Sequence, residues 1–74
     1  RRHELDKLIP NRLREARAAR GLTQAQLARA LDTHEKQICR WELGETQPRP
    51  RTVVAIADCL GVPVAHLTGG ASSD

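Results

Sequence analysis

Apolar residues recur along this chain at spacings of three and four residues, in segments separated by glycine or proline. Such spacings place side chains on one face of a helix. The spacing is clearest in residues 52–60, where the apolar side chains are Val53, Ile56, Ala57 and Leu60. The pattern therefore predicts amphipathic helices rather than strands.

Residues that favour helix starts and ends divide this pattern into segments. Pro10 suits a first helical turn, and Gly21 and Gly44 suit the residue that follows a helix. Thr23 is a good N-cap, and Gln26 is placed to complete a capping box with it. The expected helices are residues 10–20, 24–31, 34–43, 52–60 and 62–67.

Two connections matter for function. Asp32 and Thr33 form a very short break between helices 24–31 and 34–43, and Asp tolerates the left-handed conformation better than most residues. The first of these helices has one apolar face, and the second combines a narrow apolar seam with a wide polar face. Such a pair predicts a helix-turn-helix. Residues 45–51 contain two prolines and are expected to form a loop.

Length and composition favour one all-α domain. Seventy-four residues are close to the lower limit for a core without disulfides. Trp41 is the only aromatic residue, so the core must consist of aliphatic side chains, which favours helices over a β-sandwich. We expect residues 10–68 to form the domain, residues 1–9 to be an N-terminal arm or extension, and residues 69–74 to be a disordered tail.

Several classes of protein are disfavoured. Cys39 and Cys59 have no spacing typical of a disulfide scaffold or a metal site, so no metal or cofactor is expected. The three histidines stand beside no nucleophile and acid, so we expect no enzyme. The sequence has no long apolar run and no signal-peptide pattern, which predicts a cytoplasmic protein away from membranes.

The charge distribution permits a nucleic-acid partner but does not establish one. The formal net charge is +3, and seven of the twelve Lys and Arg residues lie in residues 1–20.

A family resemblance makes the expectation specific. It is carried by Leu22-Thr23-Gln24-x-x-Leu27-Ala28, by Ile38-x-Arg40-Trp41-Glu42-x-Gly44, by Pro48 and by Ile56-Ala57-Asp58-x-Leu60-Gly61-Val62. In order and spacing these segments resemble the phage-repressor (Cro/C1, XRE-type) helix-turn-helix family over about residues 11–68. The resemblance implies a compact five-helix, lambda-repressor-like fold. It also implies a cytoplasmic, nucleoid-associated transcriptional regulator of a prokaryotic cell or phage, in particular a repressor that binds an operator in double-stranded DNA.

The resemblance also assigns roles to residues. Helix 34–43 is expected to read the major groove, with base-reading side chains Glu35, Lys36, Gln37 and Arg40. The expected contacts to the DNA backbone come from Thr23, Gln24, His34, Arg49 and Arg51, with Gln24 also bracing the first residues of the reading helix. Arg17 and Glu42 are expected to form a structural ion pair. His34 is a poor N-cap, and Asp32 stands where the family often has glycine.

Two further expectations concern partners. Val62, Val64 and Leu67 exceed the apparent needs of the core, and the family often pairs through this region, so we expect a homodimer through the C-terminal helix region. The alternative function is an antitoxin-type or other protein-binding module with the same fold. A partner-binding segment would favour that alternative, and residues 1–8 are the one candidate.

Overall fold

Each helix begins or ends at a residue that local physical chemistry favours there. The computed structural model describes residues 7–69, so most of the expected arm and tail, residues 1–6 and 70–74, lies outside this range. Within it the chain forms five helices and no strand, which confirms the all-α prediction. They are α2 (Pro10–Ala19), α3 (Gln24–Ala30), α4 (Glu35–Leu43), α5 (Pro50–Leu60) and α6 (Val64–Thr68).

The start of α3 shows how closely local sequence sets a boundary. The Thr23 hydroxyl accepts a hydrogen bond from the Gln26 backbone N–H at 3.0 Å, and the Gln26 side-chain oxygen accepts one from the Thr23 N–H at 2.8 Å. The predicted capping box is confirmed, and it satisfies two donors that a helix start would otherwise leave without partners.

The start of α5 differs from the prediction. The expected loop 45–51 ends two residues earlier, because α5 begins at Pro50. Proline in the first turn needs no N–H partner, so Pro50 starts the helix instead of excluding it. Arg49 is consequently the N-cap residue of α5, and Arg51 lies in its first turn. Pro63 likewise precedes α6 as its N-cap residue.

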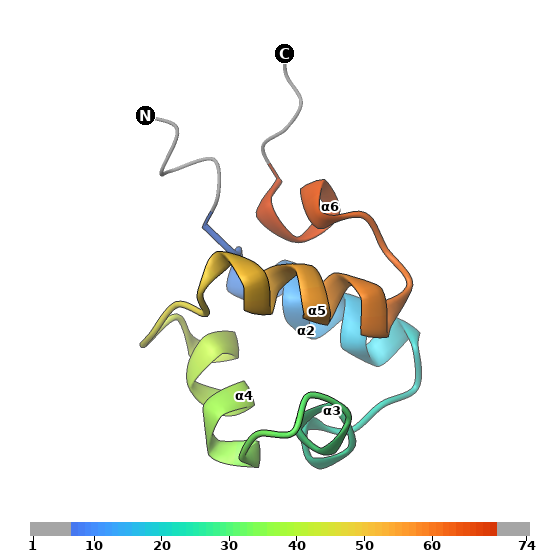
Figure 1. Cartoon of the computed structure of the whole chain (residues 1–74), viewed down its shortest axis with the longest axis vertical. Helices are drawn as coiled ribbons and strands as arrows, with labels where there is room; N and C mark the ends of the chain where they lie inside the picture. The colour runs from blue at the N-terminus through green and yellow to red at the C-terminus, as the bar shows by residue number, and fades with distance from the viewer. Residues whose placement is uncertain (1–6, 70–74) are drawn as a thin grey trace.

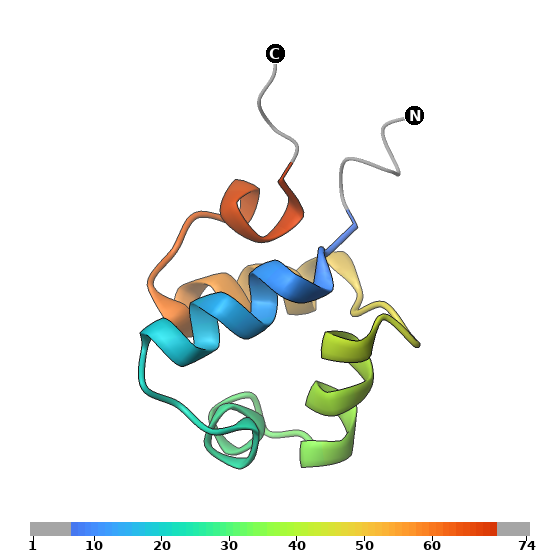
Figure 2. The ribbon, with the colours of Figure 1, turned by 180° about the vertical axis from the view of Figure 1, so that it is seen from behind.

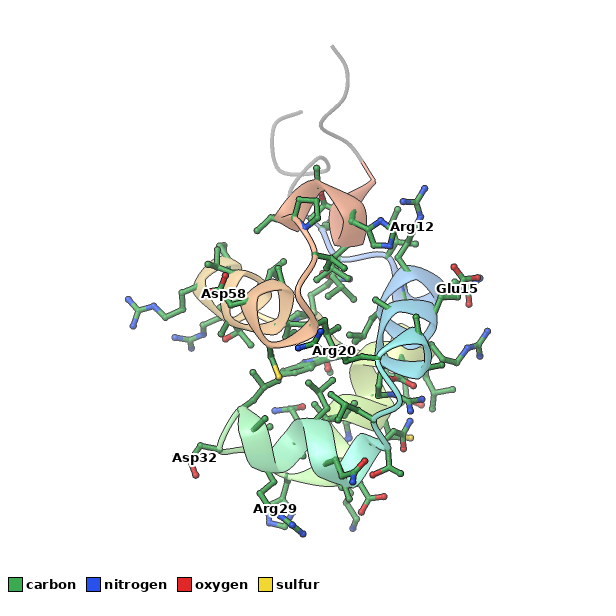
Figure 3. All side chains as sticks on the ribbon, turned by 90° about the vertical axis from the view of Figure 1, so that its right-hand side faces the viewer. Arg12, Glu15, Arg20, Arg29, Asp32 and Asp58 are labelled. Atoms are coloured by element: carbon green, nitrogen blue, oxygen red, sulfur yellow. The ribbon has the colours of Figure 1, made fainter. Side chains whose placement is uncertain are left out.

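One fully buried side chain from each helix meets in the core. These side chains are Leu13, Leu27, Ile38, Ile56 and Leu67, each 0% exposed. In the views of Figures 1 and 2, α2 and α5 both cross the middle of the molecule, one in front of the other, with α6 on one side of them and α3 and α4 on the other. Figure 3 shows α2 and α5 on opposite sides of the core. The helix-turn-helix is therefore displayed on the side of the domain opposite α6.

The position of Leu67 corrects one prediction. Leu67 is fully buried and Val62 packs partly buried against the core, so neither is surplus to the core's needs. Of the three residues on which the dimer prediction rested, only Val64 is exposed, at 38%. The sequence pattern was misleading because a five-residue helix places only one or two residues against the core, and their phase cannot be read from so short a segment.

Candidate nucleic-acid interface

The turn between α3 and α4 is closed by a residue in the left-handed conformation. Asp32 has φ of 58°, the one positive φ outside glycine among residues 7–69. The Asp32 N–H donates to the Arg29 carbonyl at 3.2 Å, and the Thr33 N–H donates to the Ala28 carbonyl at 2.9 Å. These two bonds form the Schellman pattern that usually ends a helix at glycine. Asp32 thus takes glycine's place, and α4 starts only three residues later.

Helix α4 has two contrasting faces. Ile38 and Trp41 are buried against the core. The opposite face is open to solvent and carries Glu35, Lys36 and Arg40, while Gln37 is half-buried beside it. The four expected base-reading residues therefore lie on one helix, three of them exposed. Leu43 continues this face at its last turn and is 65% exposed.

The beginning of α4 lacks a side-chain cap. His34 occupies the N-cap position with extended backbone angles, but its side chain makes no capping hydrogen bond. This outcome agrees with the expectation that histidine is a poor cap. The His34 side chain is exposed, and Glu35 follows it in the first turn of α4.

A polar hollow lies between α4 and the segment that leads into α5. Its volume is about 540 Å³, and its walls include Gln37 and Arg40 from α4, Thr33 from the turn, and Arg49 and Thr52 from the start of α5. Arginine, hydroxyl and amide side chains thus share the wall of this hollow with the apolar Leu31, Trp41 and Pro48. The charged residues of the wall are Arg40, Arg49 and Asp32, so two positive charges stand against one negative charge. This balance favours an anionic group of phosphate size in the polar hollow.

Seen from the side, the helix-turn-helix forms one end of the molecule (Figure 3). Arg29 and Asp32 project there from α3 and its turn, and Arg12 lies at the opposite end beside α6. The Arg12 side chain donates to the His66 carbonyl at 3.0 Å, so it is engaged with α6. Arg12 therefore belongs to the α6 end of the molecule and not to the exposed face of α4.

Arg17 and Glu42 form a partly buried ion pair that joins α2 to α4. Arg17 Nε donates to Glu42 Oε2 at 2.6 Å and Arg17 Nη2 donates to Glu42 Oε1 at 3.0 Å, a bidentate arrangement. Arg17 Nη1 donates further to the Leu22 carbonyl at 2.8 Å. The side chains are 15% and 4% exposed, so solvent screens the pair little. The pair fixes α4 relative to α2.

The pair also sets the charge state of Glu42. Burial by itself raises the pKa of this carboxyl group, but hydrogen bonds from Arg17 and Gln24, with the charges of Arg17 and Arg14, outweigh burial and lower the pKa below its ordinary value. The hydrogen bond to Glu42 raises the pKa of Arg17. Both groups are therefore ionised near neutral pH.

Gln24 is held differently from what we expected. Its Nε2 donates to Glu42 Oε1 at 3.0 Å, so it contacts the last turn of α4 rather than the first residues of that helix. Thr23 is exposed at the N-cap of α3, and Arg51 is exposed in the first turn of α5.

Gln47 is a residue that the sequence interpretation missed. Its side-chain Oε1 accepts a hydrogen bond from the Leu8 backbone N–H at 2.9 Å, and its Nε2 donates to the Leu8 carbonyl at 2.9 Å. The partners are 39 residues apart, so no local pattern could have indicated the contact.

Residues 7–69 contain no group of three or more His, Cys, Asp or Glu side chains that could hold a metal ion. None of the helices α2 to α6 is long and apolar enough to cross a membrane.

A comparison with protein families agrees with this geometry. The model of the helix-turn-helix family of Cro/C1 (XRE) type matches residues 13–67, most of the chain and all of the helices except the first turn of α2 and the last residue of α6. Domains of this family bind DNA, and they are typically not enzymes. The chain therefore belongs to the Cro/C1-type (XRE) family of helix-turn-helix DNA-binding domains.

Proposed function

We propose that this protein is a transcriptional repressor that recognises a specific site in double-stranded DNA with the exposed face of α4. The observation that carries the proposal is the juxtaposition of that face with the polar hollow, whose walls bear Arg40 and Arg49. A helix fits the major groove of B-DNA, which is about 12 Å wide. The hollow beside such a helix, in which two arginines stand against one aspartate, suits a phosphate of the adjoining backbone.

The residues on the α4 face have the chemistry that base reading needs. Arg40 and Lys36 can donate to guanine O6 and N7, Gln37 can pair with adenine, and Glu35 can accept from cytosine N4. Lys36 and Arg40 are four residues apart on α4, so they reach neighbouring base pairs. We assign direct base contacts to these four residues.

A second set of residues is assigned to the DNA backbone. Arg49 and Arg51 stand at the start of α5, while Thr23 and Gln24 stand at the start of α3 and His34 precedes α4. Backbone contacts of this kind fix the register of the reading helix without carrying sequence information. The Gln24 amide has two N–H groups, so its bond to Glu42 leaves one for a phosphate.

We further propose that two copies bind together in the cytoplasm on an inverted-repeat site. Ile9 and Val64 are each 38% exposed, and the Ile9 N–H bonds the Leu67 carbonyl, so apolar surface remains beside α6. Light scattering over a range of protein concentrations, with and without a duplex of operator length, tests this. A monomer under all these conditions contradicts the pairing.

The main experiment is selection of binding sites from a random pool of double-stranded DNA. The affinity of the selected duplex and of a scrambled duplex is then measured at two salt concentrations, because phosphate contacts make all binding salt-dependent. We expect an enriched inverted repeat that binds on the order of a thousandfold or more tightly than the scramble.

Two results would contradict the proposal. Weak binding that depends on salt but not on sequence would remove the base-reading role of α4. Absence of enrichment together with capture of a defined protein partner would favour the protein-binding alternative.

A further inference from the structure

The loop between α4 and α5 is tied to the residues that precede α2. The Gln47 bridge, meaning the two hydrogen bonds between the Gln47 carboxamide and the Leu8 backbone, uses both the acceptor and the donor of that carboxamide at 2.9 Å. Leu8 is only 2% exposed, so the partner of the bridge is a fixed part of the core. Gln47 itself is largely exposed. An exposed side chain thus reaches a buried backbone across 39 residues of sequence.

Gln47 itself lies on the wall of the polar hollow, together with the two residues that follow it. Pro48 follows Gln47 and is buried, and Arg49 follows as the N-cap residue of α5, with extended backbone angles of −69° and 157°. Pro50 then starts the helix. The Arg49 backbone is therefore held from the α5 side by the helix and from the loop side by Pro48 and the Gln47 bridge.

We propose that Gln47 is a positioning residue for DNA binding, which holds the loop so that Arg49 keeps its place on the wall of the polar hollow. This inference rests on the proposed function, because it concerns how the backbone contact is prepared before DNA arrives. A loop that is already ordered in the free protein loses less conformational entropy when DNA binds, so its affinity for DNA is higher.

The chemistry of the bridge explains why the side chain is glutamine. A carboxamide matches a peptide group, donor to acceptor and acceptor to donor. Glutamate at this position offers no N–H to the Leu8 carbonyl, and leucine offers neither group. The Leu8 side chain packs in the core, so its backbone has a fixed position. The two hydrogen bonds of the bridge therefore restrain the position of Gln47 in the loop.

The test uses the full 74-residue chain with Gln47→Leu and Gln47→Ala, and Cys59→Ala as the matched control. Cys59 is partly buried against the core on α5, so its truncation lowers stability without touching the loop. Three quantities are measured well below the melting temperature: hydrogen exchange of the Leu8 amide, affinity for the selected duplex and its scramble, and the effect of Arg49→Ala in each background.

We expect the Leu8 amide to exchange at least about tenfold faster in both Gln47 variants, because its acceptor is removed. Affinity should fall about three- to tenfold on all duplexes alike, with base preference unchanged. The effect of Arg49→Ala should be smaller in the Gln47 variants than in the unsubstituted chain, since Arg49 is then less well placed. Cys59→Ala should change none of the three.

Other results overturn the inference. An unchanged exchange rate of the Leu8 amide means that the bridge does not hold the backbone in solution. Faster exchange with unchanged affinity, or an Arg49→Ala effect of full size in the Gln47 variants, means that the bridge does not position Arg49. Absence of selective DNA binding by the unsubstituted chain overturns the proposed function and this inference together, whereas the preceding results leave the proposed function intact.

Discussion

Replacing Arg17 by methionine isolates the ion pair that holds α4 in place. Methionine keeps much of the packing volume of the arginine stem but offers no donor. The substitution removes two hydrogen bonds to Glu42, at 2.6 and 3.0 Å, and one to the Leu22 carbonyl at 2.8 Å. The Glu42 carboxylate then stays buried, at 4% side-chain exposure, with Gln24 as its remaining partner.

The expected loss of stability follows from these contacts. A hydrogen bond to a charged group contributes about 1.5–3 kcal/mol, so the two bonds to Glu42 amount to about 3–6 kcal/mol. Breaking a buried ion pair costs about 3–5 kcal/mol, which agrees with this sum. A domain of this size has an unfolding free energy of only about 4–11 kcal/mol. Arg17→Met should therefore leave the fold marginal, and it should be studied at low temperature.

A second variant distinguishes the free energy lost with the ion pair from the cost of leaving the Glu42 carboxylate buried without its partner. In Arg17→Met/Glu42→Leu no carboxylate remains buried, so the loss should shrink to about 1–2 kcal/mol. Urea denaturation followed by circular dichroism, as a double-mutant cycle with the two single variants, measures this coupling. A loss below about 1 kcal/mol for Arg17→Met, the size expected of an exposed pair, would refute the reasoning.

The pH dependence of stability provides an independent test of how the ion pair shifts the pKa of Glu42. In the unsubstituted protein the pKa of Glu42 is lowered, so its stabilising effect is complete above the ordinary value of 4.5 and is lost as the pH falls through the lower folded value. In Arg17→Met the hydrogen bonds and the charge of Arg17 no longer oppose burial, so we expect the pKa of Glu42 to be higher than in the unsubstituted protein, and protonation relieves the buried charge. The stability gap between the two proteins should therefore narrow between about pH 7 and about pH 4. A constant gap would contradict the assignment.

Three further predictions concern the reading helix, the loop and the turn. Arg40→Ala should cost about 1–3 kcal/mol on the selected duplex and relax base preference at one position; an equal loss on all sequences would make Arg40 a backbone contact. Arg49→Ala should weaken binding to all duplexes and reduce the salt slope by about one, and a loss confined to one base pair would contradict this. Asp32→Gly should leave the unfolding free energy within about 1 kcal/mol, whereas Asp32→Val should lower it by about 1–3 kcal/mol; equal stabilities in urea denaturation would show that the left-handed turn carries no strain.

Much of this fold could be predicted from the sequence because it depends on local interactions. The Thr23–Gln26 capping box lies within four residues, and the periodic apolar residues that predict the helices are the residues that meet in the core. Asp32 could likewise be predicted to adopt a left-handed turn, because its side chain tolerates that conformation. Arg17 and Glu42, 25 residues apart, were paired by family resemblance and not by any local rule.

The start of α5 and the packing of α6 could not be predicted correctly from the sequence. Two prolines close together indicated a loop, but the second of them starts α5, because a proline's effect depends on whether it lies before or within the first helical turn. The sequence pattern suggested that Leu67 is surplus apolar surface. In the structure α6 packs against both α2 and α5, and Leu67 is buried there. This burial depends on the packing of three helices, so it could not be predicted from one short segment.

The sequence by itself determined the helices, the family and the polar face of α4, since these depend on contacts between residues a few positions apart or on a pattern of residue types. Tertiary structure alone decided the bond of Gln24 with Glu42, the Gln47 bridge to Leu8 and the meeting of Arg40 with Arg49 around one hollow. These contacts join residues on different elements, and no local sequence pattern identifies partners that are far apart in the chain. The relative placement of the helices, which the shared core fixes, is what brings them together.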